Sequence, residues 1–144
     1  MPSLYHENGY LYNCYVQAIK YFACHSVEQY ERDMKRFTEH VKKYQVFYKN
    51  FWVYHIFGDV MAIPDYAEAR KRFIYAAAEF CLVQSLAFIQ FTINGSLKRE
   101  EYIYIISSVS RRMEHSARLR TKLMERLNAF NAAGAGGLLL MIIS

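Results

Sequence analysis

Apolar residues recur through residues 27–55 at alternating spacings of three and four. The positions in this seam are Val27, Tyr30, Met34, Phe37, Val41, Tyr44, Tyr48, Phe51 and His55. Such spacing is typical of one apolar edge on a long α-helix that faces partner helices. Aromatic side chains at alternate seam positions are too bulky for a tight two-stranded coiled coil. The sequence therefore predicts an all-α fold, an antiparallel four-helix bundle followed by a short apolar C-terminal tail.

Capping and stop signals divide the chain into four expected helices. The N-terminal signals are Ser26 with Gln29, Asp65 with Glu68, and Ser96. The stop signals are Gly58 and Asn94-Gly95. The first two N-terminal signals are capping boxes, and a glycine just beyond a helix favours a left-handed turn. The helices expected from these signals span residues of about 9–24, 26–57, 65–94 and 96–130.

A change in composition separates a bundle domain, residues 1–131, from a tail, residues 132–144. The tail opens with a Gly/Ala hinge and ends in six apolar residues: Leu138, Leu139, Leu140, Met141, Ile142 and Ile143. This run is too short to span a bilayer. We expect it to make assembly contacts with a neighbouring copy, although docking on its own bundle or on lipid is an open alternative.

Positive charge is concentrated near the C-terminal end of the predicted bundle. The chain has a net charge of +5, and residues 98–126 carry eight lysines and arginines against four glutamates. The candidate binding residues are Arg111, Arg112, His115, Arg118, Lys122 and Arg126. Five of them follow spacings of four, three, four and four, which would place them on one stripe of a continuous helix. A cationic stripe of this kind suits nucleic-acid phosphates without base specificity. The alternative is a solvated helix face.

The stretch 73–93 has the length of a membrane-spanning helix but contains Glu79, Gln84 and Gln90. Basic residues flank it on both sides, so a helix buried among other helices is the favoured interpretation. Glu79 is the only charged residue in the stretch. Arg120, on the apolar side of the last helix, would either extend its charge to solvent or pair with a buried acid, for which Glu79 is the candidate.

No catalytic, metal-binding or nucleotide-binding motif is apparent, so we expect a protein that is not an enzyme and needs no cofactor or metal. Three unpatterned cysteines do not indicate a disulfide framework. The N-terminus lacks the pattern of a secretory signal, which favours a cytoplasmic location.

The basic face, the 13 tyrosines and the apolar tail together resemble the four-helix coat proteins of filamentous archaeal viruses. This resemblance implies a structural subunit that self-assembles into a filament, wraps double-stranded DNA and resides in the virion. Two alternatives stay open. One is a small cytoplasmic interaction module, such as an immunity protein, secretion chaperone or adaptor. The other is a peripheral membrane protein that uses the basic stripe and the tail together.

Overall fold

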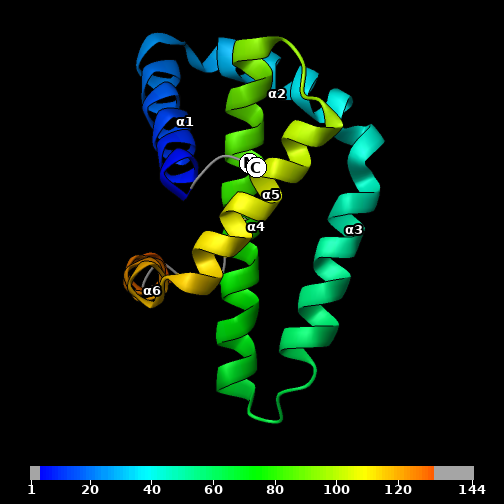
Figure 1. The fold of residues 1–144 in the computed structure, drawn as a ribbon, viewed down its shortest axis with the longest axis vertical. Helices are drawn as coiled ribbons and strands as arrows, with labels where there is room; N and C mark the ends of the chain where they lie inside the picture. Colours follow the sequence, from blue (N-terminus) through cyan, green and yellow to red (C-terminus); the bar gives the residue numbers. More distant parts are fainter. Residues whose placement is uncertain (1–3, 132–144) are drawn as a thin grey trace. The chain divides into compact units, whose positions relative to one another are not determined.

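A computed structural model of the chain describes residues 4–131, which are helical and contain no strand. The predicted all-α class is therefore confirmed. In chain order the helices are α1 (Leu4–Cys24), α2 (Val27–Val41), the 3₁₀ helix η1 (Lys42–Tyr44), α3 (Gln45–Tyr54), the π-helix η2 (His55–Val60), α4 (Tyr66–Asn94), α5 (Arg99–His115) and α6 (Ala117–Asn131) (Figure 1).

The described residues form two compact units. Within the described residues, unit 1 contains residues 4–48 together with Val83–Ser108, and unit 2 contains Lys49–Leu82 together with residues 109–131. Helices α4 and α5 each contribute one part to unit 1 and the other part to unit 2. The predicted domain limit after residue 131 lies at the edge of the described residues and stays a prediction.

Several helices begin or end at the capping and stop residues that the sequence predicted. The Ser26 hydroxyl accepts the Gln29 amide at 3.2 Å at the start of α2. Before α4, the Asp65 carboxylate accepts the Ala67 amide at 2.8 Å. Helix α4 ends at Asn94, and Gly95 follows with φ of 71°, in the left-handed region that favours glycine.

Helix α1 starts at Leu4, before the predicted residue 9, and two of the predicted end signals are wrong. Gly58 does not end a helix, because the chain widens into η2 and the Met61 amide donates to the Ile56 carbonyl at 2.8 Å. The helix predicted over residues 26–57 is therefore divided into α2, η1, α3 and η2. Ser96 does not cap α5. The Glu101 carboxylate instead accepts the Lys98 amide at 2.8 Å, so the helix starts three residues later.

Unit 1 is organised around an aromatic cluster on α4. The edges of Tyr21, Tyr30 and Phe37 pack in T-shaped contacts against Phe88, with ring centroids between 5.4 and 5.6 Å apart. Phe88 is 2% exposed. Edge-to-face contacts add to the apolar burial of the rings, so α1 and α2 are both held against the same part of α4.

A buried acid links α1 to α2 inside this unit. The Asp33 carboxylate accepts hydrogen bonds from the Tyr21 hydroxyl at 2.7 Å and from the Gln29 side-chain amide at 3.0 Å. Burial opposes ionisation of Asp33. The two hydrogen bonds and the nearby Arg36 charge outweigh burial and hold the pKa of Asp33 below its ordinary value. The ionised carboxylate therefore stabilises the folded state.

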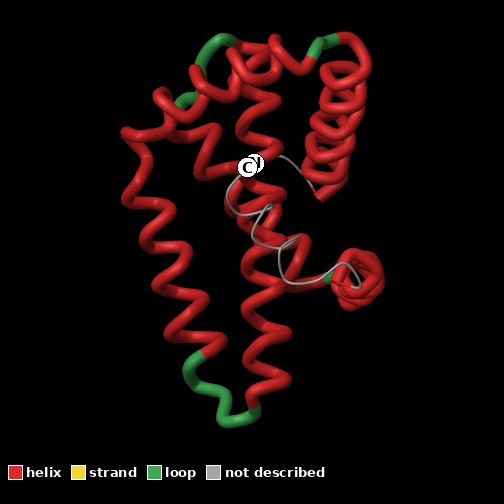
Figure 2. The backbone as a smooth tube through the Cα atoms, turned by 180° about the vertical axis from the view of Figure 1, so that it is seen from behind, coloured by secondary structure: helices red, strands yellow, loops and turns green. Residues whose placement is uncertain are grey.

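Unit 2 contains a helical hairpin made by the end of α3, η2 and the first part of α4, with a loop between them (Figure 2). Ring contacts close the hairpin, because Trp52 lies 5.3 Å from Phe80 and 5.9 Å from Phe73 between centroids. The alanines at 76–78 are buried on α4. Of these, Ala76 lines the site described below.

Among the helices that the structure describes, α4 is long and apolar enough to cross a membrane by length and composition. Core helices of soluble proteins pass the same test, and 56% of the apolar window of α4 is buried inside the protein. The burial agrees with the interior helix that Glu79, Gln84 and Gln90 predicted.

Replacing Tyr21 with phenylalanine tests the Asp33 network. Tyr21→Phe should lower the free energy of unfolding by about 1–3 kcal/mol near neutral pH, because it leaves a buried carboxylate short of a donor. An acid with a lowered folded-state pKa contributes stability above its unfolded pKa of about 3.9, and loses it as the pH falls through the folded value. The cost of the substitution should therefore shrink in urea unfolding measured at about pH 3.

Tyr12→Phe is the matched control, because Tyr12 lies on the same helix and is 65% exposed. This control should unfold like the wild type at either pH. Equal losses for the two variants near neutral pH would contradict a stabilising role of the Tyr21–Asp33 hydrogen bond.

Candidate functional site

The predicted basic stripe does not lie on one helix. Helix α5 ends at His115, and Ser116 starts α6 by accepting the Leu119 amide on its hydroxyl and the Arg120 amide on its carbonyl, each at 3.1 Å. The chain changes direction there, so that α6 is viewed end-on in Figure 1 while α5 is not. The regular spacing across residues 111–126 is therefore interrupted at Ser116.

The candidate residues divide between these two helices. Arg111, Arg112 and His115 lie on α5 with exposed side chains, and Arg118 and Lys122 are exposed on α6. The side chain of Arg126 and the whole run Leu138–Ile143 lie outside the described residues. Nucleic-acid binding by the six residues and assembly through the tail stay untested predictions.

Unit 2 contains a cavity of about 140 Å³. Its walls combine aromatic, acidic and basic side chains from the hairpin with residues of α5 and α6. The lining residues are Tyr54, His55, Arg72, Tyr75, Ala76, Glu79, Met113, Glu114 and Arg120. The lining is mostly polar, with Ala76 and Met113 as its apolar part.

Glu79 is the buried acid of the cavity, with 6% of the residue exposed. The Ser110 hydroxyl donates a hydrogen bond to its Oε1 atom, and Nε2 of His55 lies 3.8 Å from its Oε2 atom. A buried carboxylate is tolerated only when it is hydrogen-bonded or paired. The Arg120 side chain that the sequence proposed as a partner lines the same cavity.

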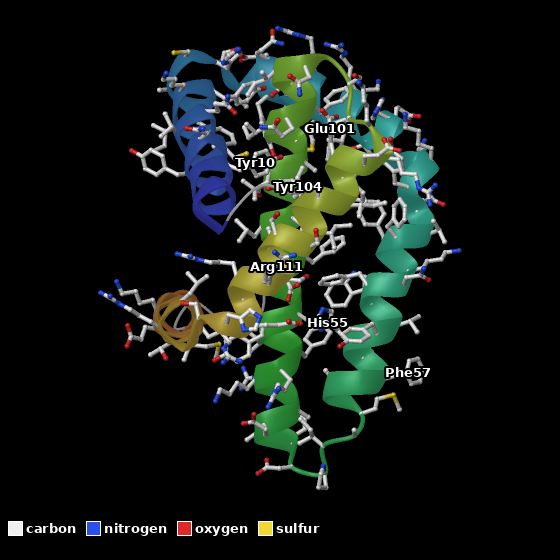
Figure 3. The ribbon with its side chains drawn as sticks, in the orientation of Figure 1. Tyr10, His55, Phe57, Glu101, Tyr104 and Arg111 are labelled. Carbon is white, nitrogen blue, oxygen red and sulfur yellow. The ribbon has the colours of Figure 1, made fainter. Side chains whose placement is uncertain are left out.

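His55 enters the cavity where α3 changes into the π-helix η2. A π turn adds a residue to the helical turn and is frequent at functional sites. The His55 ring packs against Phe51 at 4.4 Å and Tyr54 at 5.3 Å between centroids. Figure 3 shows His55 on the side of its helix that faces α4, whereas Phe57 points away from α4. The imidazole therefore lies on the face of the hairpin that carries Glu79, where the π segment begins.

Two acids, Glu79 and Glu114, and two arginines, Arg72 and Arg120, line the cavity. Arg72 donates to Glu68 at 3.1 Å, outside the cavity lining, and Glu68 is shared with Lys71. Arg120 lines the same cavity as the carboxylates of Glu79 and Glu114. Among these groups Glu79 is the buried one, and it is the group that would attract a positively charged side chain.

Cavity volume limits what the site can hold. Pockets that enclose drug-sized or cofactor-sized ligands measure about 300–1,000 Å³, well above the volume found here. Within the described residues, no group of three or more His, Cys, Asp or Glu side chains is placed to hold a metal ion. The fold and the site thus define a helical domain with a small cavity built around one buried carboxylate.

The model of the family described as the FliB lysine N-methylase C-terminal domain matches residues 5–141. The chain belongs to this family. Neither the search of curated proteins nor the search of solved structures gave a significant match.

This match overturns several predictions made from the sequence. The resemblance to coat proteins of filamentous archaeal viruses is wrong, and so are the filament-forming DNA-packaging function and the virion location. The prediction of a protein that is not an enzyme is also wrong, because the family is a domain of a lysine N-methylase. A basic face and high tyrosine content are shared by many helical proteins and specify no activity.

Replacing Ser116 tests the break between α5 and α6. As an N-cap, Ser116 should stabilise the fold, so Ser116→Ala should cost about 0.5–2 kcal/mol in thermal or urea unfolding. If residues 99–131 formed one helix, alanine would be the better helix former and the substitution would be stabilising. A loss of stability in Ser116→Ala would therefore indicate a helix break at Ser116, and a gain would indicate one continuous helix.

Ser107→Ala is the control, because Ser107 is exposed inside α5 and its hydroxyl bonds only to carbonyls of its own helix. That substitution should be neutral or slightly stabilising. A destabilisation at Ser107 as large as at Ser116 would argue against a special role for the cap.

Proposed function

We propose that this chain serves a lysine N-methylase by receiving the side chain of a substrate lysine in the cavity of unit 2. The observation that carries the proposal is the buried Glu79 carboxylate at a cavity of about 140 Å³ that fits one side chain. Membership of the lysine N-methylase family supports lysine as the cation.

The lining matches the two chemical parts of a lysine side chain. The four-carbon stem needs apolar walls, which Ala76 and the buried Met113 provide. The ammonium needs negative charge, which Glu79 provides in a setting where surrounding water is scarce and Coulomb attraction is correspondingly stronger. Tyr54 and Tyr75 line the same cavity, and aromatic rings attract cations.

A methylase also takes its methyl group from a donor. The cavity volume does not fit a nucleoside-bearing donor, so we assign the cavity to the acceptor side chain and derive no step through the donor. The contribution proposed for this domain is to bind and orient the lysine, which lowers the entropic cost of bringing acceptor and donor together.

Calorimetric titration with Nα-acetyl-lysine methylamide tests the proposal directly. The probe should bind the intact chain, and the norleucine analogue, which has the same stem without the charge, should bind at least about tenfold more weakly. Glu79→Gln should weaken binding of the lysine probe by a similar factor, because it removes the charge and keeps the shape.

Glu31→Gln is the matched control, since Glu31 is exposed on α2 in unit 1. It should bind the lysine probe like the wild type. The proposal would be overturned if the lysine probe failed to bind, or if the lysine and norleucine probes bound equally. The comparison of the two probes on the unmutated chain stands even if Glu79→Gln fails to fold.

A further inference from the structure

We infer that the unit 2 cavity binds N-methylated lysine more tightly than unmodified lysine. This inference rests on the proposed lysine-binding function and concerns the same site. It gives the domain a second role, which is to retain the product of methylation. The argument depends on how many hydrogen-bond acceptors the cavity offers and on what surrounds them.

The Glu79 carboxylate is already engaged. Its Oε1 atom accepts from Ser110 and its Oε2 atom faces His55 at 3.8 Å. An unmodified ammonium brings three N–H donors and leaves strong hydrogen bonds to water behind. Glu79 offers its negative charge to such a group but not a full set of acceptors. Each N-methyl group removes one donor that would otherwise need a partner.

Desolvation also favours the methylated cation. A buried polar donor without an acceptor carries a free-energy cost, and a methyl group in the same place has none. The charge is kept, so attraction to Glu79 is kept as well. At about 0.8 kcal/mol for each buried methyl, affinity should rise about fourfold per methyl group added.

The walls of the cavity have the chemistry that methyl-ammonium groups prefer. Tyr54 and Tyr75 line it together with the imidazole of His55 and the carboxylate of Glu79. Aromatic faces beside an acid recognise methylated ammonium groups through cation–π attraction and apolar contact. Tyr75 is half-buried, whereas Tyr54 is 65% exposed, so Tyr75 should carry more of the preference.

The other charged groups that line the cavity do not reverse this order. Arg72 is paired with Glu68, and Arg120 acts equally on methylated and unmethylated cations because their charge is the same. Glu114 is exposed, so its attraction for either cation is screened by water. The difference between the two ligands therefore comes from the buried part of the cavity.

A titration series on the intact chain tests the inference. The probes are Nα-acetyl-lysine methylamide and its Nε-monomethyl, dimethyl and trimethyl forms. We expect the dimethyl form to bind about tenfold or more tightly than the unmodified form. Tyr75→Leu, which removes the ring but leaves an apolar side chain, should reduce the preference to about threefold or less.

Tyr66→Leu is the matched control, because Tyr66 lies on the same helix, does not line the cavity and is 82% exposed. It should leave the whole series unchanged. Equal affinities across the series, or tightest binding of the unmodified form, would overturn the inference and leave the proposed lysine site standing. Failure of all four probes to bind would remove both.

Discussion

Helix α4 is largely apolar and must be covered by other helices on several sides. The few polar side chains in its apolar stretch determine which helices pack against it. The helix contains 29 residues and is about 44 Å long. Gln84 accepts from Tyr48 and donates to Tyr102 in unit 1, and Gln90 bonds to Gln17 there. In unit 2, Glu79 accepts from Ser110. Because a buried polar group without a partner is costly, these few side chains select the helices that pack beside α4.

The same requirement explains why the cavity is polar. Glu79 cannot be buried against alanines and aromatic rings alone, so Ser110 and His55 have to approach it. His55 stands where the π turn begins. The small side chain of Ala76 leaves space in the cavity that a larger residue would fill. The polar cavity therefore follows from satisfying the single charge in the otherwise uncharged stretch 73–93.

Local signals allowed most of the helical fold to be predicted. The caps at Ser26 and Asp65 and the stop at Asn94-Gly95 depend on neighbours within a few residues, so they are visible in the sequence. The π-helix through Gly58 and the cap at Ser116 also depend on hydrogen bonds between near neighbours, but no change in the sequence pattern marks them. At both positions the surrounding apolar spacing continues, and periodicity alone does not reveal the change.

The site was harder to predict than the fold. Glu79 stands out in the sequence as the one charge in an apolar stretch, but its partners are 24 residues earlier and 31 residues later in the chain. Tyr75 looks like any core aromatic, and His55 falls in the apolar seam. The clustered basic residues gave the clearest sequence pattern and led to the wrong function. Cavities arise from tertiary packing, which one sequence does not display.

The central claim, that the unit 2 cavity receives a lysine side chain, is tested most directly at the methyl group of Met113. This side chain lines the cavity and is 5% exposed, whereas Met34 lies on α2 in unit 1. Methyl resonances of ¹³C-methyl-methionine protein should be followed as Nα-acetyl-lysine methylamide is added. The account predicts a saturable shift of the Met113 resonance with no shift of Met34. A Met113 resonance that does not move while the probe binds would contradict the account.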